Sequence, residues 1–277
     1  MRLLNGLEAI VAGWREVSLV DVIGAPSFTV WFSHCNFKCP WCSNSRIASG
    51  IEGRPIKISE IVDAVKQAAP FVEYLHVTGG EPTLQMEPLH CLFKAVKRGL
   101  SLLTSLSTNG SNPSALRHLM PLLDHVAIDV KAPLSDPGKY AVVAGVRRIL
   151  AGKVVSKVRE SILISLEAPF LELRTTIVPG LIGLEEFEAI LIDIRELVEE
   201  GEVRGRVAYV IQQFIPYEGV RDPLFSSLKR TPPGLLKRLA RLASQRLPFE
   251  VYVRSIEEGT RRVGGPARIR TGDHHLS

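Results

Sequence analysis

The sequence predicts an α/β fold in which six β/α units form an incomplete, TIM-like barrel around a parallel sheet. Short apolar runs rich in β-branched residues recur along the chain, and most are followed by a stretch with the apolar spacing of a helix. The bodies of the runs stay apolar, whereas four consecutive runs end in polar motifs. Because the carboxyl ends of the strands carry the active site in a β/α barrel, we expect a site at that end of the sheet.

Six apolar runs predict the strands of the sheet. They occupy residues 27–34, 74–79, 100–108, 125–132, 170–178 and 207–215. A shorter run at residues 249–255 could add one more strand at an edge. Residues 1–26 precede the first unit, and we expect them to form a hairpin or a cap.

The segments between the strands have the spacing and the end signals of helices. Ser59 is suited to cap the first of them, and Asn112 caps another that has Pro113 in its first turn. The predicted helices cover residues 58–69, 88–99, 112–123, 155–166, 184–197 and 232–246.

The composition predicts a single globular domain. Of the 277 residues, 45% are hydrophobic and 23% are charged, which is ordinary for a globular protein. Neither a repeat of fixed period nor a low-complexity linker is found, so a second domain is not required. We therefore expect one domain over residues 1–255. Residues 256–277 are rich in Gly, Arg and polar residues, which predicts a mobile tail.

Charge and hydropathy argue against a membrane or a nucleic acid as partner. No apolar run reaches the roughly 18 to 20 residues of a membrane helix. The first residues include Glu8 and lack a small-residue cleavage site, so we expect a cytoplasmic protein. The net charge of +5 is spread along the chain, without a dense basic run interleaved with aromatic residues.

Three of the four cysteines follow the first predicted strand, within eight residues. Cys35, Cys39 and Cys42 are too close together for a disulfide framework, but thiolates in one loop can converge on a soft metal centre. A closed zinc site would need a fourth ligand, either Cys91 or His34. Cys91 lies in a helical stretch among apolar neighbours, where we expect a buried thiol. The cysteines alone therefore leave an iron–sulfur site and a zinc site open.

Two glycine-containing motifs follow the next two strands. Residues 78–83 (TGGEPT) follow the second strand; two glycines let backbone approach a ligand closely, and Glu81 offers a carboxylate to an ammonium group. Residues 107–110 (STNG) end the third strand with small hydrogen-bonding side chains. Alone, each motif could be only a turn or a helix cap.

Charged side chains mark the fourth and fifth strands. Alternation along a strand places Asp129 and Lys131 on the same face, where they could contact ribose hydroxyls and a carboxylate. Arg174 lies within the fifth strand. Singly, these residues could be a strand-end ion pair and a surface side chain. Because all the motifs occur at or near the same ends of consecutive strands, we expect one shared site.

The ordered set of motifs resembles the radical S-adenosylmethionine superfamily. Within it, the chain is most similar to the glycyl-radical-enzyme activases, namely the activating proteins of anaerobic ribonucleoside-triphosphate reductase and the pyruvate formate-lyase activating enzymes. The resemblance covers residues 15–255. The motifs that carry it, in order, are CNFKCPWCSN, TGGEPTLQ, TNG, DVKAPL, RTTIVPGL and QQF.

The resemblance implies two cofactors. Cys35, Cys39 and Cys42 would bind three irons of an oxygen-sensitive [4Fe-4S] cluster, and the amino and carboxylate groups of S-adenosyl-L-methionine would chelate the fourth. Ser107 stands where close relatives often have Asp. The residues implied at the S-adenosylmethionine site are Trp41, Gly79, Gly80, Glu81, Ser107, Asn109, Asp129, Lys131 and Arg174.

The same resemblance implies the activity. Such an enzyme reductively cleaves S-adenosylmethionine to a 5'-deoxyadenosyl radical, which generates a glycyl radical on a partner such as anaerobic ribonucleoside-triphosphate reductase. A ferredoxin or flavodoxin would supply the electron under anaerobic conditions. One alternative is a radical enzyme acting on a small molecule, as the similar carboxy-deazaguanine synthases do. Another is a non-catalytic iron–sulfur or zinc module, which would leave the TGGEP and DVK motifs unexplained.

Overall fold

A computed structural model describes residues 6–264 and arranges them around one sheet of ten strands. Its strand order is β10-β9-β8-β7-β6-β5-β4-β2-β1-β3. Seven neighbouring strands run parallel: β2 (Ala25–Phe32), β4 (Tyr74–Gly79), β5 (Leu103–Thr108), β6 (His125–Asp129), β7 (Phe170–Ile177), β8 (Arg206–Gln213) and β9 (Glu250–Ser255). Three more pair antiparallel outside them: β1 (Glu8–Val22), β3 (Arg54–Lys57) and β10 (Gly259–Gly264).

The six predicted strands are confirmed as β2 and β4 to β8, and the predicted additional strand is β9, which does not lie at the edge because β10 pairs with it. Within residues 6–264 the sheet does not close, because β3 and β10 each pair on one side only. The predicted fold class, an incomplete β/α barrel of parallel strands, is therefore confirmed.

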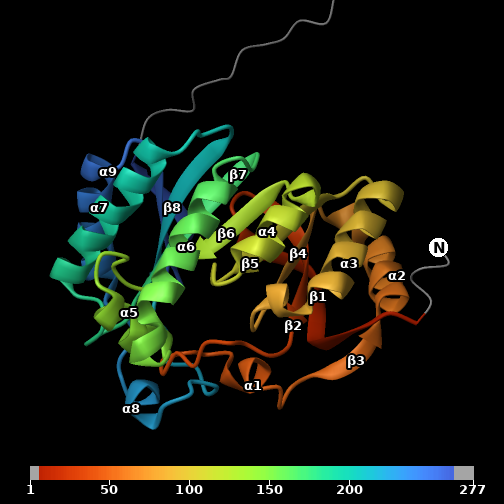
Figure 1. Ribbon diagram of the computed structural model, residues 1–277, viewed down its shortest axis with the longest axis horizontal. Coiled ribbons are helices and arrows are strands. Elements are labelled where there is room, and N and C mark those ends of the chain that lie inside the picture. Colours follow the sequence, from red (N-terminus) through yellow and green to blue (C-terminus); the bar gives the residue numbers. More distant parts are fainter. Residues whose placement is uncertain (1–5, 265–277) are drawn as a thin grey trace, which may run out of the picture.

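Helices cover one face of this sheet, side by side in Figure 1. They differ from the prediction in that α6 begins at residue 151 rather than 155, and in that α5 and the short helices α1 and α8 were not predicted. None of the helices in the described part of the chain has the length and apolar character needed to span a membrane. The helices are α1 (Ser45–Ala48), α2 (Ile58–Ala68), α3 (Met86–Gly99), α4 (Pro113–Leu119), α5 (Pro137–Ala144), α6 (Ala151–Ser165), α7 (Leu184–Glu200), α8 (Pro223–Ser226) and α9 (Pro233–Arg246).

The two faces of the sheet differ in polarity. Leu75 and Val77 of β4 belong to the main apolar core together with Phe93 of α3. The residue between them, His76, points to the opposite face because side chains alternate along a strand. There its Nδ1 lies 2.6 Å from Oγ of buried Ser105. The concave face of the sheet therefore contains buried polar side chains beneath the ends of the strands.

The long strand β1 covers part of this concave face. The hairpin expected in residues 1–26 forms between β1 and β2, and its turn carries Ile23. Ile23 packs against buried Ala208, Val210 and Tyr252 on β8 and β9. The end of the hairpin thus closes off a part of the sheet that the helices leave uncovered.

The carboxyl-terminal segment differs from the expectation of a mobile tail from residue 256. Gly259–Gly264 form β10, which pairs antiparallel with β9. The pairing uses backbone groups, and the side chains of β10 are mostly exposed, so its sequence lacks the alternation that marks other strands. The remainder of the predicted tail, from residue 265, lies outside the described residues.

Candidate active site

A cavity of about 300 Å³ lies at the carboxyl ends of the parallel strands. It is formed by loops and strand ends from β2 to β8, as the strand-end motifs predicted. The sequence-predicted residues that line it are Cys35, Cys39, Trp41, Cys42, Gly79, Gly80, Ser107, Asn109, Asp129, Lys131 and Arg174. Among the predicted residues only Glu81 is missing from its walls.

The cysteine loop, residues 33–44, is held on one side by the end of β4. Gly80 N donates a hydrogen bond to Phe32 O, and Glu81 N donates to His34 O, each at 2.8 Å. A Cβ atom on Gly79 would lie 2.2 Å from Phe32 O, and one on Gly80 would lie 2.1 Å from His34 O. The two glycines are therefore needed for close approach of the cysteine loop, and since both also line the cavity, their predicted contact with a ligand stays a prediction.

The carboxyl end of α5 holds the same loop on another side. Lys38 N donates to Ala144 O at 3.1 Å, and Trp41 Nε1 donates to Val143 O at 2.9 Å. Gly145 ends α5 with φ of +63°, and a Cβ atom there would lie 2.0 Å from Lys38 O. The sequence reasoning missed this support, although the α5 cap at Asp136 and the terminal glycine were visible signals.

A third contact comes from the loop that follows β8. Arg221 N donates to Cys42 O at 3.1 Å, and Asp222 N donates to Pro40 O at 2.9 Å. Segments that are far apart in sequence thus fix the backbone of the cysteine loop from three directions.

The three thiols differ in burial, and burial keeps two of them in the neutral form. Cys39 is buried, while Cys35 and Cys42 are half-buried at the cavity. Burial raises the pKa of Cys35 to about 11 against a hydrogen bond from Phe37 N, and that of Cys39 to about 12 against the nearby charge of Lys131. Without a cation the thiols of Cys35 and Cys39 therefore stay protonated, and a metal centre would bind them as thiolates with release of protons.

A single zinc ion does not fit these side chains. Across residues 6–264, no group of three or more His, Cys, Asp and Glu side chains is arranged to hold one metal ion. Cys91 lies half-buried on α3, and neither it nor His34 lines the cavity. An iron–sulfur cluster fits better, because it spreads its cysteine ligands over separate irons.

Asp129 and Lys131 form an ion pair at the cavity wall. Lys131 Nζ lies 2.9 Å from Asp129 Oδ2 and 5.3 Å from the centre of the Trp41 ring. Burial opposes the charge on Lys131, but the carboxylate of Asp129 raises the pKa of Lys131 above its ordinary value. A fixed ammonium group therefore faces the cavity beside the thiols, with an aromatic ring against it.

Glu81 lies behind the cavity wall and joins two of the motifs that line it. Its carboxylate is fully buried and accepts hydrogen bonds from Thr83 N (3.1 Å), Thr83 Oγ1 (2.6 Å), Thr108 Oγ1 (2.8 Å) and Asn109 N (2.7 Å). These bonds join the TGGEPT and STNG motifs to one another. Glu81 thus positions two strand ends that line the cavity, and its predicted contact with an ammonium group stays a prediction.

Arg174 is buried rather than exposed, and three groups hold it at the cavity. Its Nε lies 2.5 Å from Glu172 Oε1, its Nη1 donates to Ser107 Oγ at 2.9 Å, and its Nη2 donates to Asp21 O at 2.8 Å. Ser107 also contacts Nε2 of His76, at 3.2 Å. Since Glu172 already supplies a negative charge to Arg174, neutral Ser107 is a compatible partner at this position.

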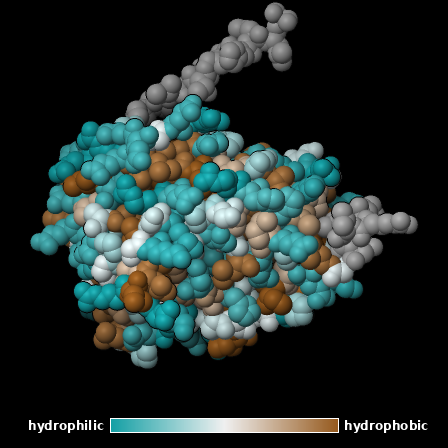
Figure 2. All heavy atoms as spheres, in the orientation of Figure 1, coloured by the Kyte–Doolittle hydropathy of each residue, from teal (hydrophilic) through white to brown (hydrophobic). Residues whose placement is uncertain are grey.

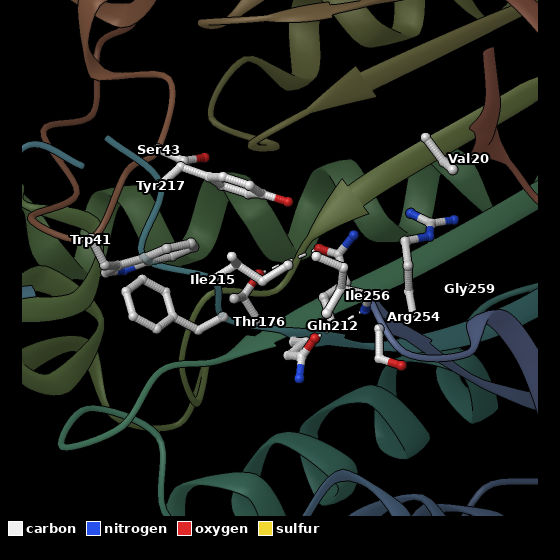
Figure 3. Close-up of a pocket in the computed structure, with 13 residues that line it drawn as sticks. Val20, Trp41, Ser43, Thr176, Gln212, Ile215, Tyr217, Arg254, Ile256 and Gly259 are labelled. Carbon is white, nitrogen blue, oxygen red and sulfur yellow. Dashed lines mark hydrogen bonds between the residues drawn. The ribbon is translucent and has the colours of Figure 1, made fainter. Parts of the chain in front are cut away.

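A second cavity of about 510 Å³ adjoins the first (Figure 3). Trp41, Ser43, Thr176 and Gln212 line both cavities. The sequence reasoning did not find this site, although its QQF motif contains Gln212. The other lining residues come from β1, from β8 with the loop after it, and from β9 with the turn that leads to β10.

The site and the incomplete barrel are those of a radical enzyme that uses S-adenosylmethionine. Residues 29–198, more than half of the chain, match the family model "Radical SAM superfamily". The chain therefore belongs to this superfamily. The cofactors of the family, a [4Fe-4S] cluster and S-adenosylmethionine, are those expected from the sequence.

The relatives that match this chain along almost its whole length and those that match only part of it are named for different activities. A Methanocaldococcus jannaschii protein, provisionally named as a glycyl-radical enzyme activating enzyme, is 28% identical over 253 residues, which cover 90% of this chain and 98% of that protein. The 7-carboxy-7-deazaguanine synthase of Thermococcus kodakarensis is 32% identical over 130 residues, which cover 40% of this chain and 51% of the synthase. A solved structure of TYW1 with a lysine-pyruvate adduct aligns with a TM-score of 0.55 and 16% identity, over 84% of this chain and 77% of TYW1. That alignment supports the fold alone.

Proposed function

We propose that the protein is an activase that generates a glycyl radical on a partner enzyme. The observation that carries this proposal is the similarity to the Methanocaldococcus jannaschii protein along almost the whole of both chains. The similarity to the 7-carboxy-7-deazaguanine synthase covers only about half of that enzyme and 40% of this chain.

In this proposal Cys35, Cys39 and Cys42 would hold the cluster, and the other cavity residues would hold S-adenosylmethionine. The bound cofactors would supply one-electron reductive cleavage of S-adenosylmethionine to methionine and a 5'-deoxyadenosyl radical, with the electron from an external reductant, and that radical would take one hydrogen atom from a glycine α-carbon. The contacts of the chain's own residues support this use. Lys131 offers a cation to a carboxylate, and half-buried Asp129 offers acceptors to hydroxyl groups.

The protein would contribute positioning and exclusion of water. Its cysteine loop is fixed from three sides, Glu81 joins two lining motifs, and Arg174 is fixed by three hydrogen-bonding groups. Rigid supports of this kind hold reacting groups in place without reorganisation during the reaction. Only Cys91 lies outside the cysteine triplet, so this chain cannot hold a second cysteine-ligated cluster. We therefore include a ferredoxin or flavodoxin as external electron donor, and the reducing cytoplasm as the location, in the proposal.

The test is an anaerobic reaction of the reconstituted protein with S-adenosylmethionine, a reductant and a candidate glycyl radical enzyme. We expect electron paramagnetic resonance to show a carbon-centred backbone radical on the partner, in amounts that follow the 5'-deoxyadenosine formed. Omission of S-adenosylmethionine is the control. Formation of 5'-deoxyadenosine without a radical on any of a panel of glycyl radical enzymes would refute the activase proposal but leave the radical chemistry intact.

A second candidate is a radical enzyme that acts on a small molecule. It is supported by the local similarity to 7-carboxy-7-deazaguanine synthases, which includes the Hyperthermus butylicus enzyme at 33% identity over 117 residues. The same reaction run with the small-molecule substrate of those synthases distinguishes the two candidates. The second candidate predicts turnover of that compound, and the activase does not.

A further inference from the structure

The second cavity lies next to the candidate cofactor site and has a mouth lined with apolar side chains. Val20 of β1, Tyr217 of the loop after β8 and Ile256 of the turn after β9 line it, yet they are 53%, 54% and 57% exposed. Figure 3 shows Val20 near one end of the lining, with Ile256 between it and Tyr217. Leu19, beside Val20, is 75% exposed. Apolar side chains grouped around a cavity mouth favour contact with another protein surface.

The floor of this cavity offers a hydrogen-bond donor at its junction with the first cavity. Gln212 lines both, and its Oε1 accepts a hydrogen bond from Thr176 Oγ1 at 3.3 Å. Among residues 6–264, its Nε2 group has no hydrogen-bond partner. The neighbouring Gln213 differs, because its Nε2 donates to Thr231 O (2.8 Å) and its Oε1 accepts from Ile256 N (3.0 Å). Gln212 is therefore free to donate to a carbonyl oxygen that enters between the two cavities.

The charge in the second cavity is already neutralised. Arg254 lines it, and its Nη2 lies 3.1 Å from Oε1 of buried Glu172, which also pairs with Arg174. The carboxylate of Asp21 interacts with both arginines as well, so two carboxylates balance the two guanidinium groups. A free carboxylate would find no unpaired cation here, whereas the carbonyl groups of a peptide backbone need only neutral or paired donors. An uncharged peptide segment therefore suits both the interior of the cavity and its apolar mouth.

We infer that the second cavity receives an extended, uncharged peptide segment of a protein substrate, which enters across Val20, Tyr217 and Ile256 and places a backbone carbonyl at Gln212. This inference rests on the proposed activase function and adds the chemistry of the segment that the activase binds. The segment carries its glycine at the junction of the two cavities, with uncharged, apolar residues on either side.

Two synthetic peptides test the inference. The first is acetyl-Ala-Val-Gly-Val-Ala-amide with two deuterium atoms on the glycine α-carbon, and the second has Asp in place of both Val residues. Binding to the cluster-reconstituted protein with S-adenosylmethionine is measured by calorimetry, and deuterium in 5'-deoxyadenosine is measured by mass spectrometry. The variants are Ile256→Asp and a matched control, Ile149→Asp, whose position is 87% exposed and lines neither cavity.

We expect the Val peptide to bind the wild-type protein and Ile149→Asp equally, and at least tenfold more weakly to Ile256→Asp. The deuterated fraction of the 5'-deoxyadenosine, at subsaturating peptide, should fall by the same factor. The Asp peptide should bind at least tenfold more weakly than the Val peptide.

Two results separate failure of the inference from failure of the proposed function. Deuterium transfer that is equal in wild type and Ile256→Asp overturns the peptide site and leaves the activase function standing. Binding that depends on Ile256 supports the peptide site, and if it occurs without any deuterium transfer, the activase function fails instead. No binding of either peptide to the wild-type protein overturns the inference.

Discussion

Glu172 pairs with Arg174 entirely inside the protein, with Oε1 and Nε 2.5 Å apart. The same oxygen lies 3.1 Å from Nη2 of Arg254. Arg174 lines the first cavity and Arg254 lines the second, so one buried carboxylate fixes a side chain in each. Both arginines interact with Glu172, and the carboxylate of Asp21 interacts with Arg174 as well. Removal of this one negative charge should therefore affect both cavities.

We expect Glu172→Gln to lower the free energy of unfolding by about 3 to 5 kcal/mol, because two buried guanidinium groups lose their shared counter-charge. Urea unfolding of the cluster-free protein measures the change. Glu199→Gln is the matched control. Glu199 pairs with Arg195 on the exposed surface of α7, and its loss should cost less than about 1 kcal/mol. Equal effects of the two substitutions would contradict a structural role for the buried carboxylate.

His76 should make folding stability depend on pH. Burial lowers the pKa of His76 to about 3. The folded protein therefore keeps the ring neutral at pH values at which the ring of the unfolded chain binds a proton. Stability contributed by the neutral ring is therefore complete above the unfolded pKa of about 6.5 and falls as the pH drops toward the folded pKa. The slope for one such group is about 1.4 kcal/mol per pH unit.

This dependence can be measured with the variant His76→Gln. As the pH is lowered from 7 to 5, the unfolding free energy of the wild-type protein should fall relative to that of the variant. Subtraction of the two proteins removes the contribution of shared groups. A difference that does not vary with pH would show that His76 titrates in the folded protein much as it does in the unfolded chain.

Replacement of one cysteine at the first cavity should remove the cluster. We expect Cys39→Ala to lose the visible iron–sulfur absorbance after anaerobic reconstitution, and with it the formation of 5'-deoxyadenosine, because two thiolates cannot hold the cluster. Cys91→Ala should retain both signals, since Cys91 lies on α3 outside the cavity. A cluster with normal iron content in Cys39→Ala would refute the assignment of this ligand.

Gly80→Ala tests the packing of the cysteine loop. The added methyl carbon would lie 2.1 Å from His34 O, which is backbone and can move only with the loop. We expect a loss of stability of about 2 kcal/mol or more and poor incorporation of the cluster. Gly152→Ala is a matched control on α6, where no atom beyond the adjacent backbone of the helix lies within 4 Å of the added carbon. Alanine there should be neutral or stabilising by up to about 1 kcal/mol, and a similar result for Gly80→Ala would contradict the packing argument.

The strands of the sheet and most of the first cavity could be predicted, because local sequence patterns indicate both. Buried parallel strands read as apolar runs, and the residues just after them lie at one edge of the sheet. The sequence therefore located Cys35, Asp129 and Lys131 correctly at the cavity. It could not show that Thr83 and Asn109 converge on the carboxylate of Glu81, because that depends on the distance between two strand ends.

Other features depend on contacts between distant segments. Helix α5 is short, and burial of Tyr140, Ala141, Val143 and Ala144 gives it no clear apolar stripe, so it was not recognised by its spacing. The second cavity joins residues from Val20 to Gly259, and no local pattern connects them. Strand β10 forms through its backbone pairing with β9, which exposed side chains do not reveal.

The anchoring of the cysteine loop has a consequence for the order of biosynthesis. Its backbone is bound by residues as late in the chain as Ala144 and Asp222. A ribosome must therefore release most of the polypeptide before those contacts exist, although the cysteines emerge early. We expect iron and sulfide delivery to follow folding, so that truncated nascent chains do not acquire the cluster. Cluster insertion is then a late step of maturation that requires the folded chain.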